Sequence, residues 1–151
     1  MSKTVDTKEY LDLVVSLLHS GKTNVPVTVS GVSMTPFLHN GDIVYLNLPD
    51  RPWQVGDVVL FTRPNGSYIL HRIVKLEEDH CQMLGDSQLT REYIDKNQIH
   101  ALVTSVRIGN RVMKMNHPYC LFYRTVWRWL APFRPQIGKL HRLLKRQKVA
   151  E

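Results

Sequence analysis

Residues 31–42 read GVSMTPFLHNGD, a turn-rich stretch that lies between two β-like runs. Its serine, Ser33, stands directly before Met-Thr-Pro. A serine in a turn usually hydrogen-bonds to nearby backbone, and this is the default role for a lone one. A serine whose backbone is tightly constrained can instead act as a nucleophile. The sequence on either side has to decide between these two roles for Ser33.

The chain around this stretch is predicted to be mainly β. Apolar runs with alternating or continuous patterns, bounded by Gly, Pro, Asn and Asp, are typical of strands. A Pro-Asn-Gly turn at 64–66 and a Gly-Asn turn at 109–110 favour hairpins. The expected strands cover residues 25–30, 43–48, 57–62, 67–78, 81–84, 99–108 and 111–115.

An amphipathic helix is expected in front of the strands, from Asp6 to Ser20. Asp6 can cap it, with Glu9 completing a capping box, and Gly21 is a natural stop. The chain is long enough for one domain with an appendage. We therefore expect three parts: an N-terminal helix packed on the domain (1–24), a β domain (25–116) and a basic, aromatic, helical tail (117–151).

The net charge of +7 lies entirely in the tail. Residues 1–116 carry 12 basic and 12 acidic side chains, whereas residues 117–151 carry eight basic and one acidic. The tail is therefore considered separately from the body. Its last part, 136–148, is expected to form a short basic helix with Ile137, Leu140 and Leu144 on one side.

Three hypotheses fit this tail. The helix could lie on the domain's own core. It could instead lie on a membrane surface, with Trp127, Trp129 and Phe133 at the headgroups and Lys/Arg facing anionic lipid. Basic charge with aromatic side chains also suits single-stranded nucleic acid, but no nucleic-acid motif supports this and nucleic acid is disfavoured.

Composition and termini exclude other classes. A hydrophobic fraction of 43% with 22% charged residues is ordinary for a folded protein. Cys81 and Cys120 lack C-x-x-C spacing and a metal-binding pattern, so reduced structural thiols are predicted, and no metal or cofactor is implied. The N-terminus does not resemble a secretory signal, and no apolar run approaches membrane-spanning length. The expected location is the cytoplasm. If the protein associates with a membrane, it is expected to be peripheral, at the inner membrane face.

An ordered set of motifs changes the interpretation of Ser33. S-M-x-P-x-L-x-x-G-D covers 33–42, a second Gly-Asp stands at 56–57, Leu-His-Arg-Ile-Val at 70–74, and a third Gly-Asp at 85–86. This series, in this order, resembles the signal peptidase I and LexA-like superfamily of serine peptidases (S24/S26) over roughly residues 25–108. The resemblance implies a LexA/signal-peptidase-like β fold, with Ser33 as the nucleophile.

The resemblance also implies a histidine base. The usual bacterial enzymes and LexA-like proteins carry a lysine on the strand that corresponds to 67–78, but here His71 and Arg72 stand there. This resembles the V-H-R-V of the endoplasmic-reticulum-type signal peptidases of eukaryotes, archaea and Gram-positive bacteria. An imidazole with a pKa near 6.5 can take the serine proton and return it to the leaving amine. The alternative is a half-buried strand histidine beside Ile69 and Ile73.

The pattern offers more than one acid to orient the imidazole. The related branch has G-D-N-x-x-x-D-D, whose last aspartate is the expected partner, and this chain reads G-D-S-Q-L-T-R-E over 85–92. Asp86 and Glu92 are equal candidates for the orienting role, with Asp95 a weaker third. A Ser-His dyad or a merely solvated acidic loop are the alternatives.

Residues beside the nucleophile are candidates for oxyanion and substrate binding: Gly31, Val32, Met34 and Pro36. Related enzymes often have a hydroxyl where this chain has Gly31, so oxyanion stabilisation is expected from backbone N–H groups, including that of Ser33. The superfamily takes its substrate as an extended strand, here expected beside 25–32. A pocket for a small P1 side chain is the family default.

The favoured function is a signal-peptidase-like serine endopeptidase that cleaves a peptide or precursor protein. One alternative is a non-catalytic peptide- or membrane-binding protein on the same fold. The other is a LexA-like regulatory protein. That second alternative is disfavoured because about 24 residues before the β body leave no room for a helix-turn-helix domain and the expected Ala-Gly cleavage bond is absent.

Overall fold

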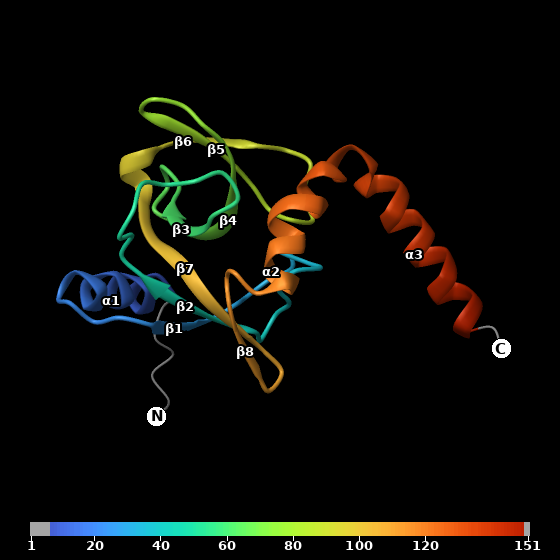
Figure 1. Cartoon of the computed structure of the whole chain (residues 1–151), viewed down its shortest axis with the longest axis horizontal. Coiled ribbons are helices and arrows are strands. Elements are labelled where there is room, and N and C mark those ends of the chain that lie inside the picture. The colour runs from blue at the N-terminus through green and yellow to red at the C-terminus, as the bar shows by residue number, and fades with distance from the viewer. Residues whose placement is uncertain (1–6, 150–151) are drawn as a thin grey trace.

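The computed structural model describes residues 7–149, and in that part eight strands form one antiparallel sheet (Figure 1). Their order is β1-β2-β7-β3-β4-β5-β6, and β8 pairs with β7. The mainly β fold predicted from the sequence is confirmed. The strands are β1 (Val25–Thr28), β2 (Ile43–Asn47), β3 (Val58–Thr62), β4 (Tyr68–Leu76), β5 (His80–Leu84), β6 (Glu92–Asp95), β7 (Ile99–Ile108) and β8 (Arg111–Lys114).

The long strand β7 joins the two halves of the sheet. It pairs with β2, β3 and β8, and Leu102 lies opposite Asn47 on one side and Val59 on the other. Buried apolar side chains divide into two clusters, one centred on Phe37, Leu38 and the strands β1, β2 and β7, and one on β3, β4 and β5. Strand β3 lies between the two clusters, and its residues 58–61 are all buried. Burial on both faces explains why its sequence is a continuous apolar run and does not alternate.

The N-terminal helix α1 (Thr7–His19) lies against the first cluster. Leu11, Val14 and Leu18 are its buried residues, at the spacing of one helical face. The Tyr10 hydroxyl donates to the carbonyl oxygen of Pro26 in β1 at 3.2 Å, which ties the helix to the sheet edge. The expected cap, Asp6, lies outside the described residues.

Strand β6 is the one strand of the described chain that the apolar pattern did not predict. Only Ile94 of its four residues is buried, so it has too short an apolar signal to be recognised. It pairs with β5 along its whole length, from Glu92 opposite Met83 to Asp95 opposite His80. A short 3₁₀ turn, η1 (Lys96–Gln98), connects it to β7. This pairing places Glu92 in the sheet instead of in a loop.

The C-terminal part has two regions with different surroundings. Helix α2 (Pro118–Phe122), the π-helical turn η2 (Tyr123–Trp127) and the 3₁₀ turn η3 (Ala131–Phe133) lie along the body, where Tyr119 and Tyr123 pack on Phe37. Helix α3 (Arg134–Val149) extends away from it (Figure 1). It starts two residues before the expected range 136–148, because Pro135 is tolerated in the first turn of a helix.

Both cysteines are buried free thiols, as predicted. Burial raises the pKa of Cys81 to about 11, so this thiol is protonated and unreactive at neutral pH. Among residues 7–149, no helix combines the length and the apolar character needed to cross a membrane.

Candidate active site

Ser33 lies in a compact loop between β1 and β2. The base of the loop is closed by Val29 N–H donating to the Asp42 carbonyl (2.8 Å) and Gly41 N–H donating to the Val29 carbonyl (2.9 Å). Met34, Phe37 and Leu38 are buried beneath it, which anchors the loop in the first core cluster. Ser33 itself is half-buried at the surface of this anchored loop. The backbone of Ser33 is therefore constrained by the closed base of its loop and by the core beneath it.

A second loop, residues 85–88, fastens Ser33 from the other side. Ser87 N–H donates to the Ser33 carbonyl oxygen at 3.0 Å, and the Ser87 hydroxyl contacts the Val32 and Ser33 carbonyl oxygens at 2.9 and 3.0 Å. A Cβ at Gly85 would lie 2.5 Å from the Ser33 carbonyl oxygen. Only glycine permits this close approach, so the glycine of the third Gly-Asp motif is explained by its contact with the Ser33 loop.

His71 lies on β4, opposite Val59 of β3, and is 1% exposed. Its Nδ1 lies 3.3 Å from Oε1 of Glu92, although the N–H is not aimed well enough at that oxygen for a hydrogen bond. The Glu92 carboxylate is gripped by Arg63, whose Nε and Nη2 donate to its two oxygens at 2.6 and 2.7 Å. The sheet thus places an imidazole, a carboxylate and a guanidinium in one row.

The electrostatics of this row favour a neutral imidazole. Burial lowers the pKa of His71, Glu92 raises it, and Arg63 lowers it. The hydrogen bonds from Arg63 lower the pKa of Glu92. At neutral pH the acid is therefore ionised and the histidine uncharged. A neutral histidine with Nδ1 facing a carboxylate leaves Nε2 as the proton acceptor.

Asp86 is placed differently. The residue is 1% exposed, and its carboxylate accepts two hydrogen bonds from Arg72, at 2.9 and 2.7 Å. Arg72 also donates to the Gly56 carbonyl oxygen at 2.9 Å, and its guanidinium lies over the Phe37 ring. Asp86 thus forms a buried ion pair under the loops, whereas Glu92 contacts the imidazole.

The third acid, Asp95, lies at the other end of β6. Its carboxylate contacts Nε2 of His80 at 2.7 Å, with both side chains about half exposed. The structure therefore brings one of the three candidate acids, Glu92, within contact of His71.

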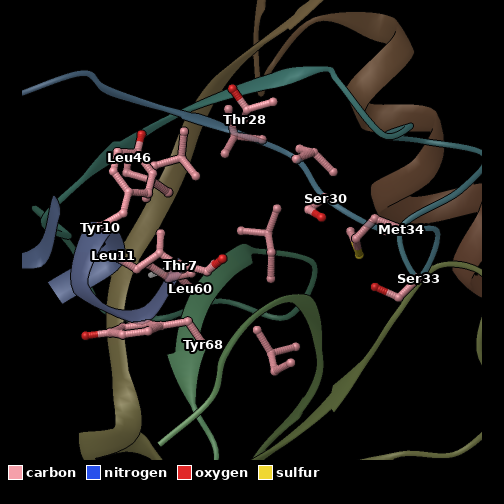
Figure 2. Close-up of a pocket in the computed structure, with 16 residues that line it drawn as sticks. Thr7, Tyr10, Leu11, Thr28, Ser30, Ser33, Met34, Leu46, Leu60 and Tyr68 are labelled. Carbon is pink, nitrogen blue, oxygen red and sulfur yellow. The ribbon is translucent and has the colours of Figure 1, made fainter. Parts of the chain in front are cut away.

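An apolar pocket opens beside Ser33, with a volume of about 190 Å³. Figure 2 shows the Ser33 hydroxyl at one end of it and Thr7, Tyr10 and Leu11 of α1 at the other. Ile69 and Leu70, which directly precede His71 in β4, also line the pocket. Ser33 and the strand that carries His71 thus face the same cavity.

The residues predicted beside the nucleophile have separate places. Gly31 lines the pocket with a positive φ of 90°, and a Cβ there would meet no atom within 4 Å. Met34 lines the same pocket from the core side, whereas Val32 points to solvent, 71% exposed. Pro36 follows a cis Thr35–Pro36 peptide bond in the loop.

Within the described residues, the hydrogen bonds of Ser33 are those that its carbonyl oxygen accepts from Ser87, and a direct Ser33–His71 hydrogen bond is not among them. Such bonds in unliganded enzymes are often long and tighten when substrate binds.

Several residues of this site were missed by the sequence interpretation: Arg63, Ser87, Trp127 and Arg134. Arg63 donates to Glu92, Ser87 donates to the Ser33 loop, and the other two contact the 85–88 loop from the C-terminal segment. Arg63 at the end of a predicted hairpin strand offered a weak signal, as a basic residue near the acids. The other three act through contacts between distant segments, for which the motif pattern carries no signal.

Comparison with known proteins identifies the family. The sequence profile described as Peptidase S24-like matches residues 2–104. The chain is also similar to the signal peptidase complex catalytic subunit sec11 of Dictyostelium discoideum, with 36% identity over 63 residues. That stretch is 41% of this chain and spans about a third (35%) of the length of this curated relative. The profile covers more than half of the chain, and the resemblance drawn from the motifs is confirmed: the chain belongs to the Peptidase S24-like family.

Proposed function

We propose that this protein is a serine endopeptidase in which Ser33 is the nucleophile, His71 the general base and Glu92 the acid that orients the imidazole. The observation that carries this proposal is the Arg63–Glu92–His71 row, whose histidine lies on β4, directly after two residues of that strand that line the Ser33 pocket. A neutral buried histidine beside an ionised carboxylate is the arrangement that activates a serine hydroxyl.

The reaction follows from these roles. Ser33 Oγ attacks the scissile carbonyl carbon while His71 Nε2 takes the hydroxyl proton, and the carbonyl oxygen becomes an oxyanion. The oxyanion is stabilised by backbone N–H groups that include that of Ser33. As the C–N bond breaks, His71 returns the proton to the leaving amine. Water, deprotonated by His71, then attacks the Ser33 ester; the bond to Ser33 Oγ breaks, His71 returns the proton to Oγ, and the acid product is released.

The substrate proposed is an extended peptide bound along β1. Val29 directs its N–H to Asp42 on the β2 side, so the alternation of an antiparallel strand turns Thr28 and Ser30 toward the open sheet edge. The 190 Å³ apolar pocket exceeds the roughly 150 Å³ cavity that holds a benzene molecule. It therefore suits an apolar side chain larger than the small residue of the family default.

The decisive test is covalent labelling with a fluorophosphonate, which esterifies an activated serine and releases fluoride. We expect stoichiometric labelling of Ser33 in the wild type and none in Ser33→Ala. His71→Ala should label at least 100-fold more slowly, the lower range of a general base's contribution, while circular dichroism shows an unchanged fold. Labelling of His71→Ala at the wild-type rate would contradict the proposal and favour a non-catalytic binding protein or a different base.

The substrate register can be tested with Thr28→Pro, which removes one N–H at the open edge. A proline on an edge strand costs the fold little, as Pro26 already shows. We expect about a tenfold rise in KM for a peptide with little change in the labelling rate, the size of one lost hydrogen bond. Val29→Pro, which removes a donor facing β2, should instead destabilise the loop itself.

We also propose that the C-terminal segment binds an anionic membrane surface. Trp129 is 80% exposed, and Phe133, Leu140 and Leu143 are each more than half exposed. Basic residues interleave with them in a segment of net charge +7, which complements anionic lipid. Trp127, in contrast, is half-buried and turned to the body. A cytoplasmic location at the inner membrane face stays a prediction from the sequence.

Co-sedimentation with vesicles tests this second proposal. We expect binding to phosphatidylglycerol vesicles that weakens with added salt, and little binding to phosphatidylcholine vesicles. Leu140→Ser with Leu143→Ser should abolish it. Equal binding to both vesicle types, or retention by nucleic acid alone, would refute the membrane proposal.

A further inference from the structure

We propose that Trp127 and Arg134, which lie outside the peptidase motifs, are positioning residues for Ser33. They act through the 85–88 loop, and the proposal rests on the function proposed above. The C-terminal segment would then be part of the catalytic apparatus and not only an appendage.

The first step is the grip of Arg134 on the loop. Its guanidinium Nη1 donates to the carbonyl oxygens of Gln88 (3.2 Å) and Gly85 (3.5 Å), so it spans both ends of the loop. Nη2 donates to the Trp127 carbonyl oxygen at 3.3 Å, and the guanidinium carbon Cζ lies 5.4 Å from the Trp127 ring centre. Arg134 is 8% exposed, although the two residues that follow it in helix α3, Pro135 and Gln136, are exposed.

Trp127 adds a third attachment. Its indole Nε1 donates to the Asp86 carbonyl oxygen at 2.8 Å. The 85–88 loop is thus held through backbone carbonyls at three of its four residues, all by donors from the C-terminal segment. Backbone contacts of this kind fix the position of a loop whatever its side chains are.

The second step runs from the loop to the nucleophile. Ser87 N–H and its hydroxyl meet the Ser33 carbonyl oxygen at 3.0 Å, and Gly85 packs against the same oxygen. A shift of the loop therefore moves the Ser33 backbone, which carries both the attacking hydroxyl and a proposed oxyanion donor. Displacements of about 1 Å at a reacting group cost up to about 100-fold in rate.

Burying a guanidinium at this place is costly for stability. Burial lowers the pKa of Arg134, Asp86 raises it and the neighbouring Arg72 lowers it, and its Nε atom has no hydrogen-bond partner within the described residues. A methionine could fill similar volume without a desolvation penalty. We attribute the presence of an arginine at this buried position to its guanidinium group, which can donate to several carbonyl oxygens at once.

The test compares the full-length wild type with Trp127→Phe and Arg134→Lys. Phenylalanine keeps an aromatic ring without the donor, and lysine keeps the charge without the fork. We expect each to label with fluorophosphonate on the order of tenfold more slowly, and to lower kcat for a peptide with KM nearly unchanged. The matched controls are Trp53→Phe, in the second core cluster, and Arg111→Lys, exposed on β8.

The melting temperature is measured for all four variants. Labelling rates are then compared at a temperature well below the lowest of these melting temperatures. Wild-type labelling and kcat in Trp127→Phe and Arg134→Lys would overturn the positioning role. So would an equal slowing in the two controls, because the effect would then be general.

Hydrogen exchange at the Ser87 amide provides a readout that does not need activity. We expect faster exchange there in Arg134→Lys than in Arg111→Lys, because the bond to the Ser33 carbonyl loosens. If the wild type neither labels nor cleaves, the proposed function fails while this exchange result still decides whether Arg134 holds the loop. Unchanged exchange would refute the positioning role by itself.

Discussion

Two arginine–carboxylate pairs flank the site, and they differ in surroundings more than in geometry. Arg72–Asp86 and Arg63–Glu92 are both doubly hydrogen-bonded at 2.6–2.9 Å. The first has side chains only 1–2% exposed beneath the loops, whereas the second is 37% and 24% exposed and contacts His71. Equal geometry therefore does not mean an equal role.

The difference follows from solvent access. A fully buried pair cannot lose one partner without leaving an isolated charge in the interior, so it acts as a structural unit. A partly exposed pair contributes little to stability, but its net field still acts on a buried neighbour. We infer that the Asp86 pair holds the loops together and that the Glu92 pair sets the state of His71. Substitutions in the two pairs should therefore have different effects, one on folding and the other on the pH dependence of activity.

Asp86→Asn should have the largest effect, and on folding. It leaves the Arg72 guanidinium buried without its counter-charge, which costs about 3–5 kcal/mol. Urea unfolding at pH 7 measures this as a lower midpoint with a similar slope. The double variant Arg72→Met with Asp86→Leu removes both charges and should recover most of the loss. An unchanged midpoint in Asp86→Asn would show that the pair is not a structural unit.

Glu92→Gln should lower the free energy of unfolding by only about 0–1 kcal/mol. It should, however, reduce kcat/KM. We expect about a 10- to 100-fold loss, less than the ~10⁴ of a triad whose acid is fully aligned, because the Nδ1–H is not aimed at Oε1. Glu92 raises the pKa of His71, so its removal should move the acid limb of the pH–rate profile to lower pH. An unshifted limb would assign the orienting role elsewhere, and Asp95→Asn is the matched control.

The sequence predicted much of this region but could not distinguish its two acids. Seven of the strands and the Ser33 and His71 motifs follow from local patterns, and the structure places strands at all seven. The choice between Asp86 and Glu92 depends on β5–β6 pairing and on which arginine each acid meets. These are contacts between segments, and β6 has one buried residue to mark it. For the same reason, the basic and aromatic composition of the C-terminal segment did not predict that Trp127 and Arg134 contact the 85–88 loop.

Arg63→Gln should have the smallest effect and the opposite sign to Glu92→Gln. Arg63 lowers the pKa of His71, so its loss should raise that pKa and shift the acid limb to higher pH. Near pH 6 this reduces activity a few-fold, because base catalysis needs the neutral imidazole, while activity well above the limb stays close to the wild type.

Stability provides an independent check on Arg63→Gln. The Glu92 pKa is lowered in the folded state, so the pair stabilises the fold above the ordinary carboxyl pKa and this contribution fades as pH falls through the folded value. Without Arg63, the free energy of unfolding should depend less steeply on pH in this acid range.

The pH–rate profiles of Glu92→Gln and Arg63→Gln, measured side by side, show how the Glu92 pair acts on His71. Opposite shifts mean that the Glu92 pair acts on His71 through its charges, and shifts of one sign mean that either change disturbs the imidazole by displacement alone.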